Sequence, residues 1–137
     1  MTMQSAPAAQ RTRVLLVDDN ESMRARAGAV LSPTCEVIGT ASDGPTAIEA
    51  AGRLSPDVIV LDISMPGMTG FDVAARLRRE GSKAAIVFLT VYADDTLVVA
   101  AREAGVIGYV LKPFLSSDLA LAVAEARAGR QFVSTIA

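Results

Sequence analysis

Short apolar runs alternate along the chain with longer helix-like stretches, and the alternation repeats five times. Short apolar runs bounded by polar residues are typical of buried strands. They predict strands near residues 13–17, 35–40, 57–61, 84–89 and 106–110. The stretches between them predict helices near residues 20–31, 45–54, 70–80, 94–104 and 117–128. Strands that alternate with helices predict an α/β fold, a doubly wound parallel sheet with helices on both faces.

Local signals mark several of the predicted helix ends. Residues 42–45, Ser-Asp-Gly-Pro, place capping side chains before a proline, which is favoured in the first helical turn. Gly81 and Gly105 follow two predicted helices, at the position where a left-handed residue commonly ends a helix.

Four of the apolar runs end at polar residues that suit phosphoryl chemistry. These are Asp18 and Asp19 after the first run, Asp62 after the third, Thr90 after the fourth and Lys112 after the fifth. The carboxyl ends of parallel strands lie along one edge of a sheet, where open α/β sheets bind ligands, so we expect these side chains to converge. Three carboxylates, a hydroxyl and an ammonium suit a divalent cation and a transferable phosphoryl group.

Each of these residues also has a simpler interpretation. Asp62 could cap a turn, but it follows four apolar residues and precedes a Pro-Gly turn, which favours a nucleophile that forms an acyl phosphate. Asp18 and Asp19 could cap the next helix. Two carboxylates beside Asp62 would repel each other without a cation, which favours a Mg²⁺ site. Lys112 is either a solvated strand-end lysine or a ligand for a phosphoryl oxygen.

The order and spacing of these residues resemble the receiver domains of two-component response regulators. The resemblance is carried by Asp18-Asp19, Asp62 followed by Met65-Pro66-Gly67, Thr90, Tyr109 and Lys112-Pro113. It implies a five-stranded sheet in the flavodoxin-like order 2-1-3-4-5, with right-handed crossovers.

The resemblance also divides the chain. It implies a receiver domain at residues 11–130 and a tail or the start of a linker at 131–137, and residues 1–10, which carry no signal-peptide pattern, are expected to be a flexible tail. The segment after Gly129 is similar to the point at which some receivers continue into a helix-turn-helix DNA-binding domain. The sequence leaves open whether the chain is a stand-alone receiver or part of a longer regulator.

The resemblance implies a role for each residue of the acidic pocket. Asp62 is the phosphorylation site. Asp19, Asp62 and the backbone carbonyl of Ser64 bind Mg²⁺ directly, and Asp18 binds it through water. Lys112 contacts a phosphoryl oxygen and partly offsets the repulsion among the carboxylates.

Thr90 and Tyr109 are expected to form a conformational switch. By resemblance, the Thr90 hydroxyl donates to a phosphoryl oxygen, and the ring of Tyr109 fills the space that Thr90 vacates. Alternatively, Thr90 bonds a nearby backbone group or caps the next helix, and Tyr109 is an ordinary aromatic residue of an edge strand. Ser64, Val91 and Tyr92 flank the expected path of water and phosphodonor, and are expected to modulate the rate of phosphotransfer and hydrolysis.

The expected function is a phosphorylation-activated signalling switch. The chain contains no histidine, so the phosphoryl group comes from a partner histidine kinase or phosphotransfer protein. We expect no enzyme activity beyond the chain's own phosphotransfer and autodephosphorylation. Phosphorylation is expected to change the surface of the fourth helix, fifth strand and fifth helix. Some of Leu97, Val98 and Val99 should face outward there and support a homodimer or effector contact; the alternative is a helix that lies deeper in the core.

Three other kinds of protein share part of this pattern. A haloacid-dehalogenase-like phosphatase needs a second Asp two residues after the nucleophile, where this chain has Ser64. A dinucleotide-binding domain needs a glycine-rich turn after the first strand, where this chain has residues 18–20, Asp-Asp-Asn. The remaining alternative is an adaptor receiver that binds partners without being phosphorylated.

Composition narrows the setting. The net charge is −2, from 13 basic and 15 acidic residues, so we expect no direct binding to nucleic acid. Cys35 is the only cysteine, which excludes an intramolecular disulfide and fits the cytoplasm. Residues 1–10 carry no signal-peptide pattern, and no apolar run is long enough to span a bilayer, so we expect no membrane association.

Overall fold

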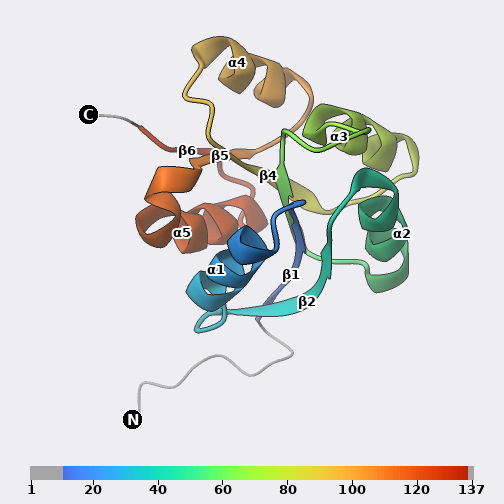
Figure 1. The fold of residues 1–137 in the computed structure, drawn as a ribbon, viewed down its shortest axis with the longest axis horizontal. Coiled ribbons are helices and arrows are strands. Elements are labelled where there is room, and N and C mark those ends of the chain that lie inside the picture. Colours follow the sequence, from blue (N-terminus) through green and yellow to red (C-terminus); the bar gives the residue numbers. More distant parts are fainter. Residues whose placement is uncertain (1–10, 136–137) are drawn as a thin grey trace.

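One parallel sheet of six strands forms the centre of the computed structural model, which describes residues 11–135 (Figure 1). The strands are β1 (Thr12–Val17), β2 (Cys35–Ala41), β3 (Val58–Asp62), β4 (Ala85–Thr90), β5 (Gly108–Leu111) and β6 (Phe132–Val133). The helices are α1 (Glu21–Leu31), α2 (Gly44–Leu54), α3 (Gly70–Arg79), α4 (Asp95–Glu103) and α5 (Leu115–Arg127), and a short 3-10 helix, Lys112–Phe114, joins β5 to α5. The five predicted strands and five predicted helices are all present, with ends within two residues of the predicted ones.

The strand order is β2-β1-β3-β4-β5-β6, which confirms the flavodoxin-like order and adds one strand at its end. The prediction of five strands was wrong, because Phe132 and Val133 pair in parallel with Gly108 and Tyr109 of β5. A strand of two residues shows no periodicity that a sequence pattern could detect. β6 lies within residues 131–137, the predicted tail or linker, whereas the predicted tail at 1–10 lies outside the described residues.

The helices cover both faces of the sheet, as predicted (Figure 1). Side chains of β1 alternate between the faces because successive residues of a strand point in opposite directions. Val14 and Leu16 belong to the core cluster on the side of α1 and α5, whereas Leu15 and Val17 belong to the cluster that also holds buried residues of α2, α3 and α4. Every residue of the central strand β3 is buried, which is typical of a parallel strand covered on both faces.

The predicted helix-end signals act as expected. The side chain of Asp43 accepts a 2.8 Å hydrogen bond from the backbone N–H of Thr46 and caps α2. Gly81 and Gly105 follow α3 and α4 with φ of 78° and 85°, a left-handed conformation that glycine adopts without strain. Within residues 11–135, no helix has both the length and the apolar character needed to cross a membrane.

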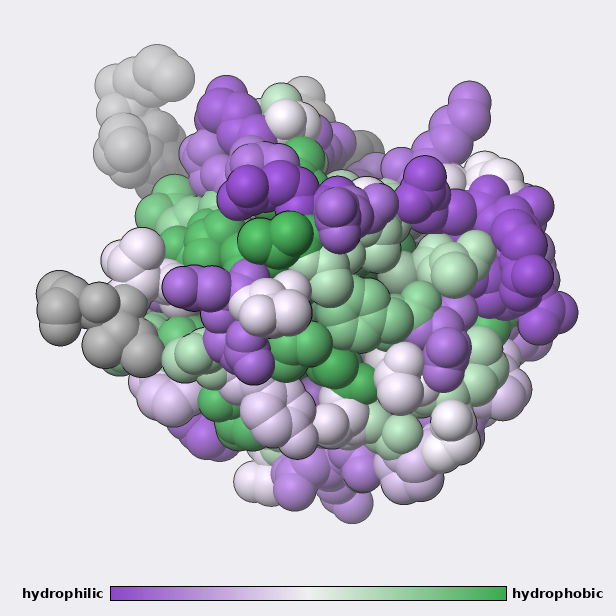
Figure 2. Space-filling view, turned by 90° about the horizontal axis from the view of Figure 1, so that it is seen from above, coloured by the Kyte–Doolittle hydropathy of each residue, from purple (hydrophilic) through white to green (hydrophobic). Residues whose placement is uncertain are grey.

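Among the five α-helices, α4 has the fewest buried residues. Of its residues only Ala101 is buried, while Leu97 and Val98 are half-buried and Val99 is 51% exposed. The expectation that part of this apolar stretch faces outward is therefore confirmed. Figure 2 views the molecule from the side on which α4 lies in Figure 1, and shows hydrophobic residues gathered in the middle of this face with hydrophilic residues around them.

Candidate functional site

The carboxyl ends of four neighbouring strands bring the predicted site residues together. Asp18 directly follows β1, Asp62 ends β3, Thr90 ends β4, and Lys112 directly follows β5. Asp18 and Asp62 are each 4% exposed, whereas Asp19 is exposed. One carboxylate oxygen from each of the three aspartates lies within 4.8 Å of the others. The structure thus forms an acidic pocket from Asp18, Asp19 and Asp62 at the edge of the sheet where the strand pattern predicted it.

Lys112 is the cation of the acidic pocket. Its ammonium nitrogen lies 3.0 Å from Oδ2 of Asp18 and 3.4 Å from Oδ2 of Asp62. Burial and the neighbouring charge of Asp18 raise the pKa of Asp62, and the charge of Lys112 offsets only part of this rise. Burial alone would lower the pKa of Lys112, but the hydrogen bonds and charges of Asp18 and Asp62 outweigh it and raise that pKa. The negative charge of the acidic pocket is therefore compensated only in part by Lys112.

The carboxylates of the acidic pocket have an acceptor position available for a hard cation. Oδ1 of Asp18 accepts a 2.8 Å hydrogen bond from the backbone N–H of Asn20. Oδ2 of Asp18 is buried, and apart from its ion pair with Lys112 it accepts no hydrogen bond from the described residues. Oδ1 of Asp62 accepts the backbone N–H of Ser64 at 3.2 Å. Clustered carboxylate oxygens with an unfilled acceptor fit Mg²⁺, which prefers oxygen ligands.

The turn between β1 and α1 separates capping from the acidic pocket. Asn20, rather than either aspartate, is the N-cap of α1, because its side chain accepts the backbone N–H of Met23 at 2.8 Å. The alternative that Asp18 and Asp19 only cap this helix is therefore wrong. Nη1 of Arg24 donates to the backbone carbonyl of Asp18 at 2.6 Å, which ties α1 to the end of β1.

Tyr92 links the residues that were predicted to switch or to modulate the site. Its backbone N–H donates to Oγ1 of Thr90 at 3.2 Å, and its backbone carbonyl accepts the Tyr109 hydroxyl at 2.6 Å. Its own hydroxyl accepts from Oγ of Ser64 at 3.2 Å, so its side chain spans from the β4 end to the β3 end of the site. Val91, the neighbouring residue, is 62% exposed and has no such contact among the described residues.

Thr90 and Tyr109 are both buried, at 0% and 3% exposure. The backbone contact proposed for Thr90 as the simpler interpretation is present, because its hydroxyl oxygen accepts from Tyr92. The simpler interpretation of Tyr109 as an edge-strand aromatic does not hold, because β6 covers the outer side of β5. Burial, followed by the nearby charge of Asp94, raises the pKa of Tyr109.

Comparison with known protein families decides what kind of domain carries this pocket. The family model described as "Response regulator receiver domain" matches residues 14–124. The chain belongs to the response regulator receiver family. The predicted resemblance is therefore confirmed, and the acidic pocket lies at the strand ends of a receiver domain.

Curated relatives of this receiver are regulatory proteins about twice as long as the matched region. This receiver is 42% identical over 119 residues to the transcriptional regulatory protein LiaR of Bacillus subtilis, and the match covers 85% of this chain and 56% of LiaR. It is also 42% identical over 125 residues to the nitrate/nitrite response regulator protein NarP of Escherichia coli, covering 90% of this chain and 57% of NarP. The chain thus spans little more than half the length of these relatives.

Solved receiver structures share its fold. The signal receiver domain of the putative response regulator NarL from Mycobacterium tuberculosis superposes with a TM-score of 0.83 at 31% identity, covering 88% of this chain and 98% of that one. A two-component response regulator of the LuxR family from Aurantimonas superposes with a TM-score of 0.85 at 28% identity, covering 90% and 89%. These similarities support the receiver fold and its strand order.

Two residues that help to build the receiver's acidic pocket were not singled out from the sequence. Arg24 carried no signal, because its contact is to a backbone carbonyl. Gly70, the first residue of α3, lies so close to β3 that an added Cβ would stand 2.6 Å from the carbonyl oxygen of Asp62 and 2.9 Å from Cα of Ile63. A glycine directly after the capping residue Thr69 is the signal that could have pointed to this close approach.

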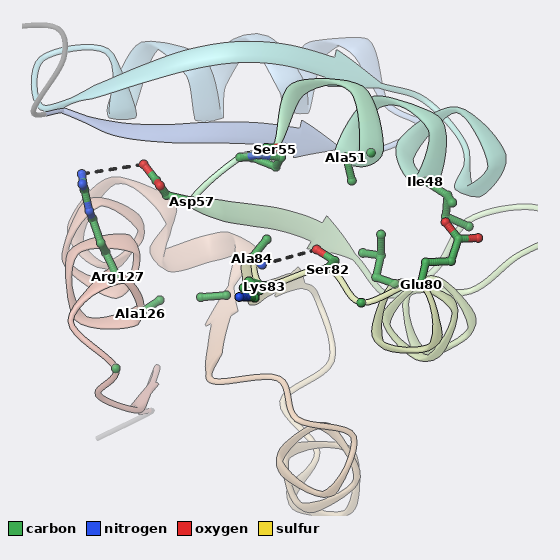
Figure 3. Close-up of a pocket in the computed structure, with 16 residues that line it drawn as sticks. Ile48, Ala51, Ser55, Asp57, Glu80, Ser82, Lys83, Ala84, Ala126 and Arg127 are labelled. Carbon is green, nitrogen blue, oxygen red and sulfur yellow. Dashed lines mark hydrogen bonds and ion pairs between the residues drawn. The ribbon is translucent and has the colours of Figure 1, made fainter.

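A separate cavity of about 710 Å³ lies at the opposite edge of the sheet, by the amino ends of β3 and β4 (Figure 3). Asp57 and Arg127 face each other across one side of it, 3.8 Å apart, and Oγ of Ser82 accepts the backbone N–H of Ala84 at 3.3 Å (Figure 3). None of the predicted site residues lines this cavity. It is therefore distinct from the acidic pocket.

Proposed function

We propose that this receiver is a phosphorylation-activated switch in which Asp62 accepts a phosphoryl group from a partner histidine kinase or phosphotransfer protein. One observation carries the proposal: the buried carboxylate of Asp62 shares a pocket with Asp18 and Asp19, within 4.8 Å, and with the Lys112 ammonium at 3.4 Å. A nucleophile, cation ligands and a fixed positive charge are thereby present at one point.

In the proposed transfer, a carboxylate oxygen of Asp62 forms a bond to phosphorus while the bond from phosphorus to the donor's imidazole nitrogen breaks. The product is an acyl phosphate, and the bonding electrons leave with the imidazole. Lys112 binds a phosphoryl oxygen as a compact positive charge. Asp19, Asp62 and the carbonyl of Ser64 would hold Mg²⁺ directly, with Asp18 acting through water. When bound, Mg²⁺ neutralises charge between the carboxylates and the phosphoryl oxygens.

The output of the proposed switch begins at Thr90. If its hydroxyl turns to donate to the phosphoryl group, the backbone N–H of Tyr92 loses its present acceptor at 3.2 Å, and the loop that follows β4 must rearrange. Tyr109 is bonded to the carbonyl of the same Tyr92, so its ring would follow. The proposed result is an altered α4-β5-α5 surface that forms a homodimer or binds an effector, as a shift between two existing arrangements.

We further propose that the chain serves in a regulator of the kind its relatives represent. LiaR is named as a transcriptional regulatory protein and NarP as a nitrate/nitrite response regulator. The receiver would act as the input part of such a protein, without contacting nucleic acid itself. Its own chemistry would be limited to accepting the phosphoryl group and to hydrolysing the acyl phosphate.

Intact-mass measurement tests this proposal. The protein is incubated with a small-molecule phosphodonor in Mg²⁺ or in EDTA, beside Asp62→Asn and the control Asp95→Asn, which changes an exposed aspartate of α4. We expect one phosphoryl group on the parent and on Asp95→Asn, in Mg²⁺ only, and none on Asp62→Asn. No gain on any folded protein would instead favour an adaptor receiver that acts without phosphorylation.

A further inference from the structure

Ser134 lies just beyond β6, outside the acidic pocket, and makes three hydrogen bonds. It is 8% exposed. Its backbone N–H donates to the carbonyl of Tyr109 at 2.8 Å. Its hydroxyl accepts the backbone N–H of Leu111 at 3.1 Å and donates to Oδ2 of Asp118 at 2.7 Å. A serine hydroxyl has one donor and two acceptor positions, so this single group joins β5 to α5.

The contact with Leu111 replaces a missing bond of the sheet. β6 ends at Val133, so its backbone ladder does not reach the last residue of β5. The N–H of Leu111 is buried there and needs an acceptor, because an unpaired buried donor is unfavourable. Ser134 supplies that acceptor from a side chain. A hydroxyl at this position therefore completes the outer side of β5.

The segment that Ser134 holds contains Lys112. Leu111 directly precedes Lys112, and the 3-10 helix Lys112–Phe114 leads at once into α5, where Asp118 lies in the first turn. Ser134 thus fixes the chain on both sides of the lysine, at Leu111 before it and at Asp118 after it. The ammonium must reach 3.0 Å from Asp18 and 3.4 Å from Asp62, so the direction of the backbone at Lys112 matters.

We infer that Ser134 is a positioning residue that fixes the backbone of Lys112 and thereby holds its ammonium in the acidic pocket. Its effect on phosphoryl transfer rests on the proposed function of Asp62. Its effect on Lys112 does not, because the ion pairs with Asp18 and Asp62 exist without phosphorylation. The two effects can therefore be measured separately.

Competitive acetylation of the amines tests the positioning directly. The chain has two lysines, and Lys83 is exposed, so it serves as the internal reference for Lys112. In Ser134→Ala we expect labelling of Lys112 relative to Lys83 to rise roughly fivefold, the ratio that corresponds to losing one ordinary hydrogen bond. Ser134→Thr keeps the hydroxyl and should restore the ratio of the parent. Ser116→Ala removes an exposed hydroxyl from the start of α5 and should leave the ratio unchanged.

A control separates positioning from general loss of stability. Leu54→Ala truncates a side chain of α2, which packs on the other face of the sheet from α5. When Leu54→Ala and Ser134→Ala are compared under conditions that give them the same free energy of unfolding, Leu54→Ala should not raise the labelling of Lys112 relative to Lys83. If Ser134→Ala does not fold, Ser134→Cys keeps the size of the side chain with a weakly bonding thiol and should raise the ratio in the same direction. Faster hydrogen exchange at the Leu111 amide verifies that the bond was lost.

Each outcome decides between the two proposals. An unchanged labelling ratio, together with faster exchange at Leu111, overturns the positioning role of Ser134 whether or not Asp62 is phosphorylated. A raised ratio in a protein whose parent accepts no phosphoryl group supports the positioning role and removes the proposed function. If both proposals hold, Ser134→Ala should lower the phosphorylation rate at saturating Mg²⁺ while the Mg²⁺ affinity does not fall below that of the parent, because moving the Lys112 ammonium away removes a charge that competes with the cation. A merely structural role would not produce this split.

Discussion

Nζ of Lys112 lies 3.0 Å from Oδ2 of Asp18, although Asp18 follows the first strand of the chain and Lys112 follows the fifth. The side chains are only 15% and 5% exposed, so water screens this ion pair weakly. The pair gives the acidic pocket a fixed counter-charge before any cation or phosphoryl group arrives. Its loss should therefore be felt in stability as well as in chemistry.

Replacing Lys112 by methionine should lower the free energy of unfolding by about 3 kcal/mol at neutral pH, because it leaves two buried carboxylates without their cation. Urea unfolding measures this, with exposed Lys83→Met as the control, which should change stability by less than about 0.5 kcal/mol. In the parent, the pKa of Lys112 is raised, so its contribution is complete below its ordinary value of 10.5. The contribution is lost as pH rises through the higher value in the fold. Equal stability of Lys112→Met and Lys83→Met would contradict the expected loss.

Asp62→Asn should stabilise the metal-free protein at neutral pH, on the order of 1 kcal/mol. The pKa of Asp62 is raised above 3.8, so folding favours its protonated form. Its contribution to stability is fully present below pH 3.8 and is lost as pH rises through the raised value. Thermal unfolding in EDTA should therefore show a gain for Asp62→Asn at pH 7 that shrinks toward pH 4. A variant less stable than the parent at pH 7 would refute this sign.

Gly70→Ala should lower the free energy of unfolding by about 2–3 kcal/mol, because the new Cβ would overlap the backbone at the end of β3. Gly52→Ala is the matched control. Gly52 lies inside α2 with nothing within 4 Å of an added Cβ, so alanine should stabilise it by about 0.5–1 kcal/mol. Melting temperatures should move in opposite directions, and a similar drop in both would show that the close approach to Asp62 is unimportant.

Tyr92→Phe should shorten the life of the acyl phosphate several-fold, because Ser64 and Tyr92 would no longer be joined beside Asp62. Stability should change by less than about 0.5 kcal/mol at this exposed hydroxyl. Tyr109→Phe removes a buried hydroxyl bonded to the Tyr92 carbonyl and should lower stability by about 1 kcal/mol. The decay of the phosphorylated mass after the donor is removed measures the lifetime of the acyl phosphate. Urea unfolding measures the stability of both variants. An unchanged lifetime in Tyr92→Phe would show that this link does not restrict water.

The sequence predicted the acidic pocket because its residues are the ends of strands. Once parallel strands are assigned, Asp18, Asp62 and Lys112 must lie along one edge of the sheet. Distances could not be predicted in this way. The pairing of Lys112 with Asp18 at 3.0 Å depends on where the 3-10 helix after β5 begins, which no periodicity encodes.

Three contacts that could not be predicted share a cause. Each rests on a backbone group that bonds a side chain of another segment, between 6 and 23 residues away in sequence. Ser134 bonds the N–H of Leu111, Arg24 bonds the carbonyl of Asp18, and the Tyr109 hydroxyl bonds the carbonyl of Tyr92. Every residue has these backbone groups, so residue type gives no hint of which will be met. β6 escaped prediction because two residues are too few to show a period.

The most direct test of the central claim is to locate the phosphoryl group. After incubation with Mg²⁺ and a phosphodonor, borohydride reduces an acyl phosphate to an alcohol, which marks the modified aspartate as homoserine in a peptide map. We predict that the mark falls on Asp62 alone, and that Asp62→Asn carries none at any position. A mark on Asp18 or Asp19, or no mark in a folded and metal-loaded protein, would contradict the assignment of Asp62 as the acceptor.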